Sequence, residues 1–131
     1  MTAALILAPG DEDPTALVAR LTIAGVPILA LGPAFLGCAG ALPADGLKAR
    51  TLLLGLRELG ADPARSWLAC ADPGILAVAA TAGLAGLVLI GIDPPPGDHP
   101  LVVVRADNLA DVPRVMVPRG GGCWHDHRPA G

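Results

Sequence analysis

The chain has 131 residues, which is near the commonest size of a single domain with one hydrophobic core. Hydrophobic residues make up 53% of it and aromatic residues only 2%, so aliphatic side chains must fill the core. The net charge of -3 and the pI near 5.4 provide no basic surface for phosphate groups, which excludes nucleic-acid binding and attraction to an anionic membrane as main functions.

Apolar runs alternate with helical patterns along the chain, which is typical of βαβ units around a mainly parallel sheet. The first part of the chain predicts four elements, namely strands at 3–8, 26–31 and 34–38 and a helix at 14–24. Asp13 is expected as the N-cap of this helix and Gly25 as its stop. Its buried face would consist of Leu17, Val18, Leu21 and Ile23.

The second part of the chain continues the alternation. A helix is predicted over 47–59, because Leu52, Leu53, Leu56 and Leu59 share one face and Gly60 follows. The further expected elements are a strand at 66–70, an Ala-rich helix from 72 or 73 to 82, strands at 87–92 and 101–104, and a helical turn at 108–112.

One uncharged segment, 73–92, is long enough for a transmembrane helix, which takes about 20 residues. Gly83 and Gly86 divide it into an Ala-rich half and a half rich in Leu, Val and Ile. A helix followed by a buried strand explains both halves, and we therefore expect no membrane span.

The cysteines and the N-terminus favour a cytoplasmic protein. Cys38, Cys70 and Cys123 are odd in number and widely spaced, which does not fit a disulfide framework. The start of the chain lacks the basic residues and the apolar length of a secretory signal. Cys70 is expected to be a small buried hydrophobic residue, not a nucleophile.

A series of short sequence pieces links the middle of the chain to a known family. They are Gly46-Leu47-Lys48, Leu59-Gly60-Ala61-Asp62-Pro63, Trp67-Leu68-Ala69-Cys70, Asp72-Pro73-Gly74 and Ala79 to Gly83, and a closing turn follows at 106–113. In order and spacing they resemble the haloacid dehalogenase-like (HAD-like) hydrolases. The resemblance implies a Rossmann-like three-layer α/β sandwich with a mainly parallel sheet and no cap domain. The expected domain covers 1–117, and a Gly-rich tail covers 118–131.

The same resemblance shows that the residues for the family's chemistry are missing. HAD-like enzymes use a nucleophilic Asp and an acid/base Asp two residues later, after the first strand, with Mg²⁺ held by the nucleophile and by acids after the fourth strand. Here the first strand ends in Leu7-Ala8-Pro9-Gly10, and the later acid positions fall on Ala71 and Ile75. The expected Ser or Thr falls on Gly32. Lys48, a candidate phosphate-binding residue, is in register.

Under a shifted alignment with the family, the chain would still be an enzyme. Asp11 and Asp13 are spaced as Asp-x-Asp, and together with Lys48 and Asp72 they could form a Mg²⁺-dependent phosphatase or phosphotransferase for a small phosphorylated molecule. We favour the inactive reading, because acids this close to Pro14 are commonly helix caps or turn residues.

The tail offers two further candidate sites. In an extended strand, Cys123, His125 and His127 would lie on one face, as half of a zinc site that His99 or a partner chain could complete. Alternatively, Trp124 and Arg128 could anchor the tail on a partner, since Trp and Arg are frequent in interface hot spots.

The sequence thus predicts a HAD-like domain without catalysis that serves as a protein-binding, regulatory or assembly module. It requires no cofactor, whereas the phosphatase alternative needs Mg²⁺ and a third alternative, a metal-binding accessory protein, uses Zn²⁺ at the tail. The expected partner is another protein, not nucleic acid or a membrane, and a homo-oligomer is left open.

Overall fold

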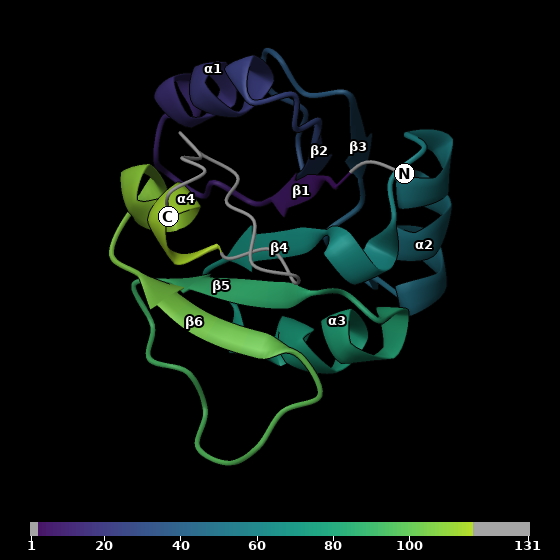
Figure 1. Ribbon diagram of the computed structural model, residues 1–131, viewed down its shortest axis with the longest axis vertical. Helices are drawn as coiled ribbons and strands as arrows, with labels where there is room; N and C mark the ends of the chain where they lie inside the picture. Colours follow the sequence, from purple (N-terminus) through teal and green to yellow (C-terminus); the bar gives the residue numbers. More distant parts are fainter. Residues whose placement is uncertain (1–2, 117–131) are drawn as a thin grey trace, which may run out of the picture.

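The computed structural model describes residues 3–116 and contains one six-stranded parallel sheet (Figure 1). The strands are β1 (Leu5–Leu7), β2 (Ile28–Leu31), β3 (Gly40–Leu42), β4 (Trp67–Cys70), β5 (Gly86–Ile90) and β6 (Val102–Ala106). Their order is β3-β2-β1-β4-β5-β6, and every neighbouring pair is parallel. The connections therefore run outward in both directions from the centre of the sheet, so that β1 and β4 flank a topological switch point.

Helices cover both faces of this sheet. The α-helices are α1 (Thr15–Ile23), α2 (Ala49–Glu58), α3 (Leu76–Ala82) and α4 (Val112–Val115), and the 3₁₀ turns are η1 (Pro63–Arg65), η2 (Pro73–Ile75) and η3 (Leu109–Asp111). Figure 1 shows α1 and α4 on one face and α2 and α3 on the other. The predicted three-layer α/β sandwich is confirmed. The absence of a cap domain stays a prediction.

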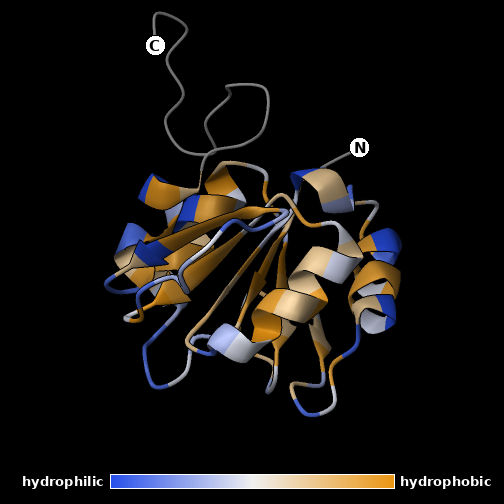
Figure 2. Ribbon diagram, turned by 90° about the horizontal axis from the view of Figure 1, so that it is seen from below, coloured by the Kyte–Doolittle hydropathy of each residue, from blue (hydrophilic) through white to orange (hydrophobic). Residues whose placement is uncertain are grey.

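Alternation along the strands produces the two cores. Leu5 and Leu7 belong to the core beneath α1 and α4, while the neighbouring Ile6 belongs to the core beneath α2 and α3. Successive strand side chains point to opposite faces, so a strand buried on both sides is apolar at every position. The orange strands between the helical layers in Figure 2 show this continuous apolar character.

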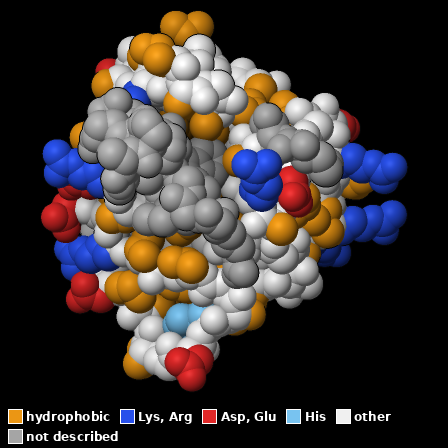
Figure 3. Space-filling view, viewed as in Figure 1, with side chains coloured by type: hydrophobic (Ala, Val, Ile, Leu, Met, Phe, Trp, Pro, Cys, Tyr) orange, Lys and Arg blue, Asp and Glu red, His pale blue; other side chains and the backbone are white. Residues whose placement is uncertain are grey.

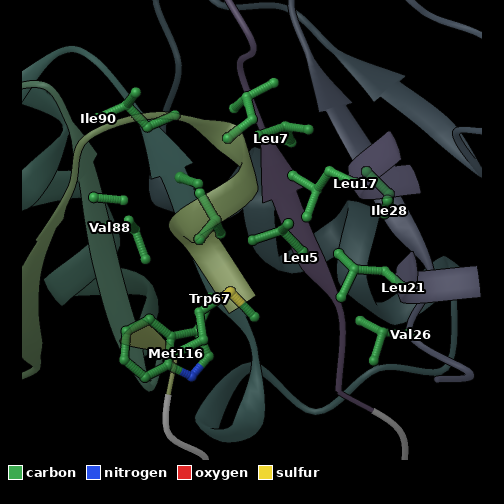
Figure 4. Packing of buried hydrophobic residues seen from close by; sticks show 14 of the residues in the cluster. Leu5, Leu7, Leu17, Leu21, Val26, Ile28, Trp67, Val88, Ile90 and Met116 are labelled. Carbon is green, nitrogen blue, oxygen red and sulfur yellow. The ribbon is translucent and has the colours of Figure 1, made fainter. Parts of the chain in front are cut away.

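Trp67 is fully buried at the start of β4, in the core against which Phe35 also packs. Figure 4 shows its ring beside Met116, in the core that also holds Leu5 and Val88. Gly86 of β5 provides the space for the ring, because a Cβ there would lie within 2.6 Å of Cε3 of Trp67. Among residues 3–116 the ring Nε1 has no hydrogen-bond partner.

Three sequence predictions are corrected by the structure. The third strand is not at 34–38 but at Gly40–Leu42, because Gly37 has a φ of +93° that interrupts an extended strand. Ile23 is 89% exposed, since it is the last residue of α1 and lies beyond the sheet-facing stripe. Leu53 is also exposed, and Gly55 takes the buried position against Leu42.

The apolar segment 73–92 consists of η2, α3 and β5, so the predicted division into helix and buried strand is confirmed. Gly83, with a φ of +75°, ends α3. In the described part of the chain no helix has the length and hydrophobicity needed to cross a membrane.

Candidate functional site

The loops that follow β1, β2, β3 and β4 enclose a groove at the carboxyl edge of the sheet, beside the switch point. It consists of two adjoining cavities of about 420 and 290 Å³, which share Ala8, Gly10, Leu31 and Ala44 in their walls. We call it the edge groove. In open parallel sheets this edge is where ligands bind. The groove therefore lies where the resemblance predicts the functional site.

The residues at the base of this groove carry no nucleophile. Ala8, which has the register of the family's nucleophile, continues β1 through a hydrogen bond from its N–H to the carbonyl of Ala69. Gly10, two residues after Ala8, has a φ of +64° and no side chain. Gly32, Ala71 and Ile75 are the further positions where the resemblance expects a functional side chain and the chain has none.

The acidic run after β1 is used locally. The carboxylate of Asp13 accepts hydrogen bonds from the backbone N–H and the hydroxyl of Thr15, and these bonds hold the pKa of Asp13 below its usual range. Asp13 was predicted as the N-cap of the first helix, but α1 begins at Thr15 and Pro14 occupies the N-cap position. Asp13 therefore lies one residue before the N-cap. Asp11 is exposed in the same loop.

Glu12, which the sequence analysis did not single out, lines the groove. Its Oε1 accepts a hydrogen bond of 3.2 Å from the N–H of Leu109, at the start of η3. This bond connects the loop after β1 with the turn after β6, across 97 positions of the chain. The one feature of the sequence that could have pointed to Glu12 is its place in an acidic run between a strand and a helix.

Asp72 and Cys70 form the wall of the groove near β4. The Oδ1 of Asp72 accepts the N–H of Gly74 at 2.9 Å and so caps η2. The thiol of Cys70 donates to the carbonyl of Asp72 at 3.4 Å. Burial raises the pKa of this thiol to about 11, so it stays protonated at neutral pH and is a poor nucleophile.

Lys48 occupies the N-cap position of α2 and is exposed. It follows β3 at the same edge of the sheet, but it is not among the residues that line the two cavities. The four candidates of the phosphatase alternative thus share one edge of the sheet, with Asp13 and Asp72 each bonded within its own turn.

A second charged cluster lies where β5 and β6 end. Arg105 contacts Asp93 at 2.6 Å and Asp107 at 3.3 Å. These carboxylates raise the pKa of its guanidinium further. All three side chains are substantially exposed, so the network contributes little to stability, and the single guanidinium balances one of the two acidic charges.

No three His, Cys, Asp or Glu side chains within 3–116 are grouped so that they could hold a metal ion. His99, the suggested fourth zinc ligand, contacts the carbonyl oxygen of Pro95 at 3.0 Å through its Nε2. The tail candidates lie outside the described residues: Cys123, Trp124, His125, His127 and Arg128.

No protein-family model and no curated protein sequence matches the chain. Two crystal structures of a dehalogenase, one of them with an intermediate complex, are similar to it in fold. Their TM-scores are 0.60 and 0.61, at sequence identities of 18% and 17%. Each comparison covers 80% of this chain and 56% of the dehalogenase chain. This likeness shows that the chain shares its α/β fold with these dehalogenases, and the chain spans little more than half of their length.

Proposed function

We propose that this chain is a HAD-like domain without hydrolase chemistry, which binds another protein through its edge groove. The side chains at the base of the groove are the observation on which this proposal rests. Ala8, Gly10 and Ala71 stand where the family places carboxylates, and none of them can attack phosphorus or hold Mg²⁺. A groove in which the positions of the nucleophile and of the metal ligands carry no carboxylate is suited to binding rather than to turnover.

The lining favours a protein partner. The groove is open, its walls are mostly small and apolar, and Phe35 of the loop after β2 lines it, next in sequence to Leu36, which is 93% exposed. Large exposed apolar side chains that adjoin a cavity are typical of protein interaction sites.

A capture experiment with a groove-filling variant tests this proposal. Ala44 is exposed and lines both cavities, so Ala44→Trp should fill the groove without disturbing the core. Ala64→Trp is the matched control, because Ala64 is exposed on η1 at the opposite edge of the sheet.

The chain would be used as bait in an extract of its own cell, with the captured proteins identified by mass spectrometry. We expect a protein that the wild type and Ala64→Trp retain and that Ala44→Trp loses. Identical sets of captured proteins for all three baits would contradict binding at the groove.

A further inference from the structure

The loops that form the edge groove carry an excess of acidic side chains. These loops are 8–14, 32–39, 43–48 and 71–75, and their five acidic residues are Asp11, Glu12, Asp13, Asp45 and Asp72. Their one basic residue is Lys48. Farther along the same edge Arg105 pairs with Asp93 and Asp107, which leaves that cluster one negative charge, whereas the five acids and one lysine of the groove loops leave four.

Two of these acids are part of the groove wall. Glu12 lines the larger cavity and Asp72 the smaller one. Each uses one carboxylate oxygen for a backbone N–H, of Leu109 and Gly74 respectively, which fixes the side chain in place. Within 3–116 the two cavities have no Lys, Arg or His in their walls. The potential in the groove is therefore negative, so that it repels an anionic ligand and attracts a cationic one.

The apolar side of the groove is equally well defined. Phe35 is half-buried in the wall of the larger cavity, and its neighbour Leu36 projects into solvent. At the opposite, amino edge of the sheet the charges are mixed, because Arg20 and Arg57 lie in the last turns of α1 and α2 and Glu58 ends α2. Figure 3 shows the face with α1 and α4, where acidic and basic side chains lie next to one another at the left margin and apolar side chains are exposed across the lower middle.

We propose that the edge groove takes a segment of a partner protein that combines an apolar side chain with a lysine or arginine. The apolar side chain would enter the cavity beside Phe35, and the cation would face Glu12 and Asp72. This inference rests on the proposed binding function and specifies the chemistry of the partner.

Selection from a displayed library of random dodecapeptides tests it on the full chain. The best peptides would be synthesised, and their affinities measured by fluorescence anisotropy. The amide NMR signals of Gly10 and Gly32 would report whether the groove is the binding site, since both glycines lie in its wall. We expect enrichment of peptides with Lys or Arg near Leu, Phe or Met, with shifts at both signals.

Charge-only variants make the test specific. Glu12→Gln and Asp72→Asn retain an oxygen that can accept the N–H of Leu109 or Gly74, and each should weaken binding about 3- to 10-fold at low salt, with a smaller effect at 0.5 M salt. Glu58→Gln, an exposed acid at the end of α2, is the control. Leu36→Ser should also weaken binding, whereas Leu54→Ser, on the outer face of α2, should not.

Two results would overturn the inference. Enriched acidic or uncharged peptides that shift Gly10 and Gly32 would show a binding groove with different chemistry, so the proposed function would stand while the cationic partner would not. Basic peptides that bind without these shifts, or with equal loss in Glu58→Gln, would reject the groove as their site.

Discussion

Gly86→Ala is the substitution whose cost follows most directly from the packing of the sheet. Gly86 lies opposite Trp67 on the neighbouring strand, and an added Cβ would come within 2.6 Å of the ring atom Cε3. The ring cannot yield, because it is fully buried and packed beside Met116 (Figure 4).

The magnitude is the difference of two terms. Overpacking of a filled core costs about 1–3 kcal/mol, and occasionally more. The φ of Gly86 is not positive, so Ala fits the backbone and restricts the unfolded chain, which returns about 0.4–1 kcal/mol. Since the ring has no free space, the upper end of the first term applies, and we expect a net loss of about 2 kcal/mol. For a domain of this size that lowers the Tm by about 10 °C.

Urea unfolding followed by circular dichroism measures this loss. Gly40→Ala is the control in a strand, because its Cβ would meet only the flexible Cδ1 of Leu29, at 3.1 Å, and it should cost less than Gly86→Ala. In a Trp67→Leu background Gly86→Ala should be close to neutral, which gives a coupling of about 2 kcal/mol. Equal costs in both backgrounds, or an unchanged midpoint in Gly86→Ala, would refute the packing argument.

Three further predictions concern hydrogen bonding, titration and the tail. Ser66→Ala should destabilise the fold by about 1–3 kcal/mol in urea unfolding, because the buried hydroxyl accepts the N–H of Ala4 and donates to the carbonyl of Asp62; an unchanged stability would mean that these groups find other partners. Since the Cys70 pKa is raised from 9.0 to about 11, the unfolded chain releases this proton first, so stability should fall by up to about 2 kcal/mol between pH 9 and 11. The fall should be smaller in Cys70→Ala, and equal slopes would assign it to other groups. If the tail docks on a partner, Trp124→Ala should weaken capture by about 2 kcal/mol while Cys123→Ser changes little. About one zinc per chain after dialysis, lost in Cys123→Ser and His125→Ala, would favour the metal site instead.

The fold was largely predictable, because apolar runs long enough for buried strands alternate with helices along the whole chain. The end of α2 follows from Gly60, the start of η2 from Pro73 and the end of α3 from Gly83, because turns and helix ends have local causes. The third strand was predicted at 34–38, too near the N-terminus, because the apolar residues of this region precede Gly37. The observed β3 begins with Gly40, a residue of low strand propensity. Its position is set by pairing with β2, which is a long-range effect.

The candidate site was predictable in its place but not in its details. Through the resemblance to HAD-like hydrolases, the sequence identifies Ala8 and Ala71 as unreactive positions. It does not identify Glu12, whose bond to Leu109 joins loops 97 positions apart, nor the isolation of Lys48 from the groove wall. Both depend on how the loops fold over the edge of the sheet.

Hydrolysis of acetyl phosphate or p-nitrophenyl phosphate in the presence of Mg²⁺ tests the central claim most directly. With no carboxylate at Ala8, Gly10 or Ala71, the purified chain should release phosphate no faster than a buffer control. Phosphate release well above that control, lost in Asp11→Asn or Asp13→Asn but retained in Glu58→Gln, would contradict the account and establish the acidic loop after β1 as a catalytic site.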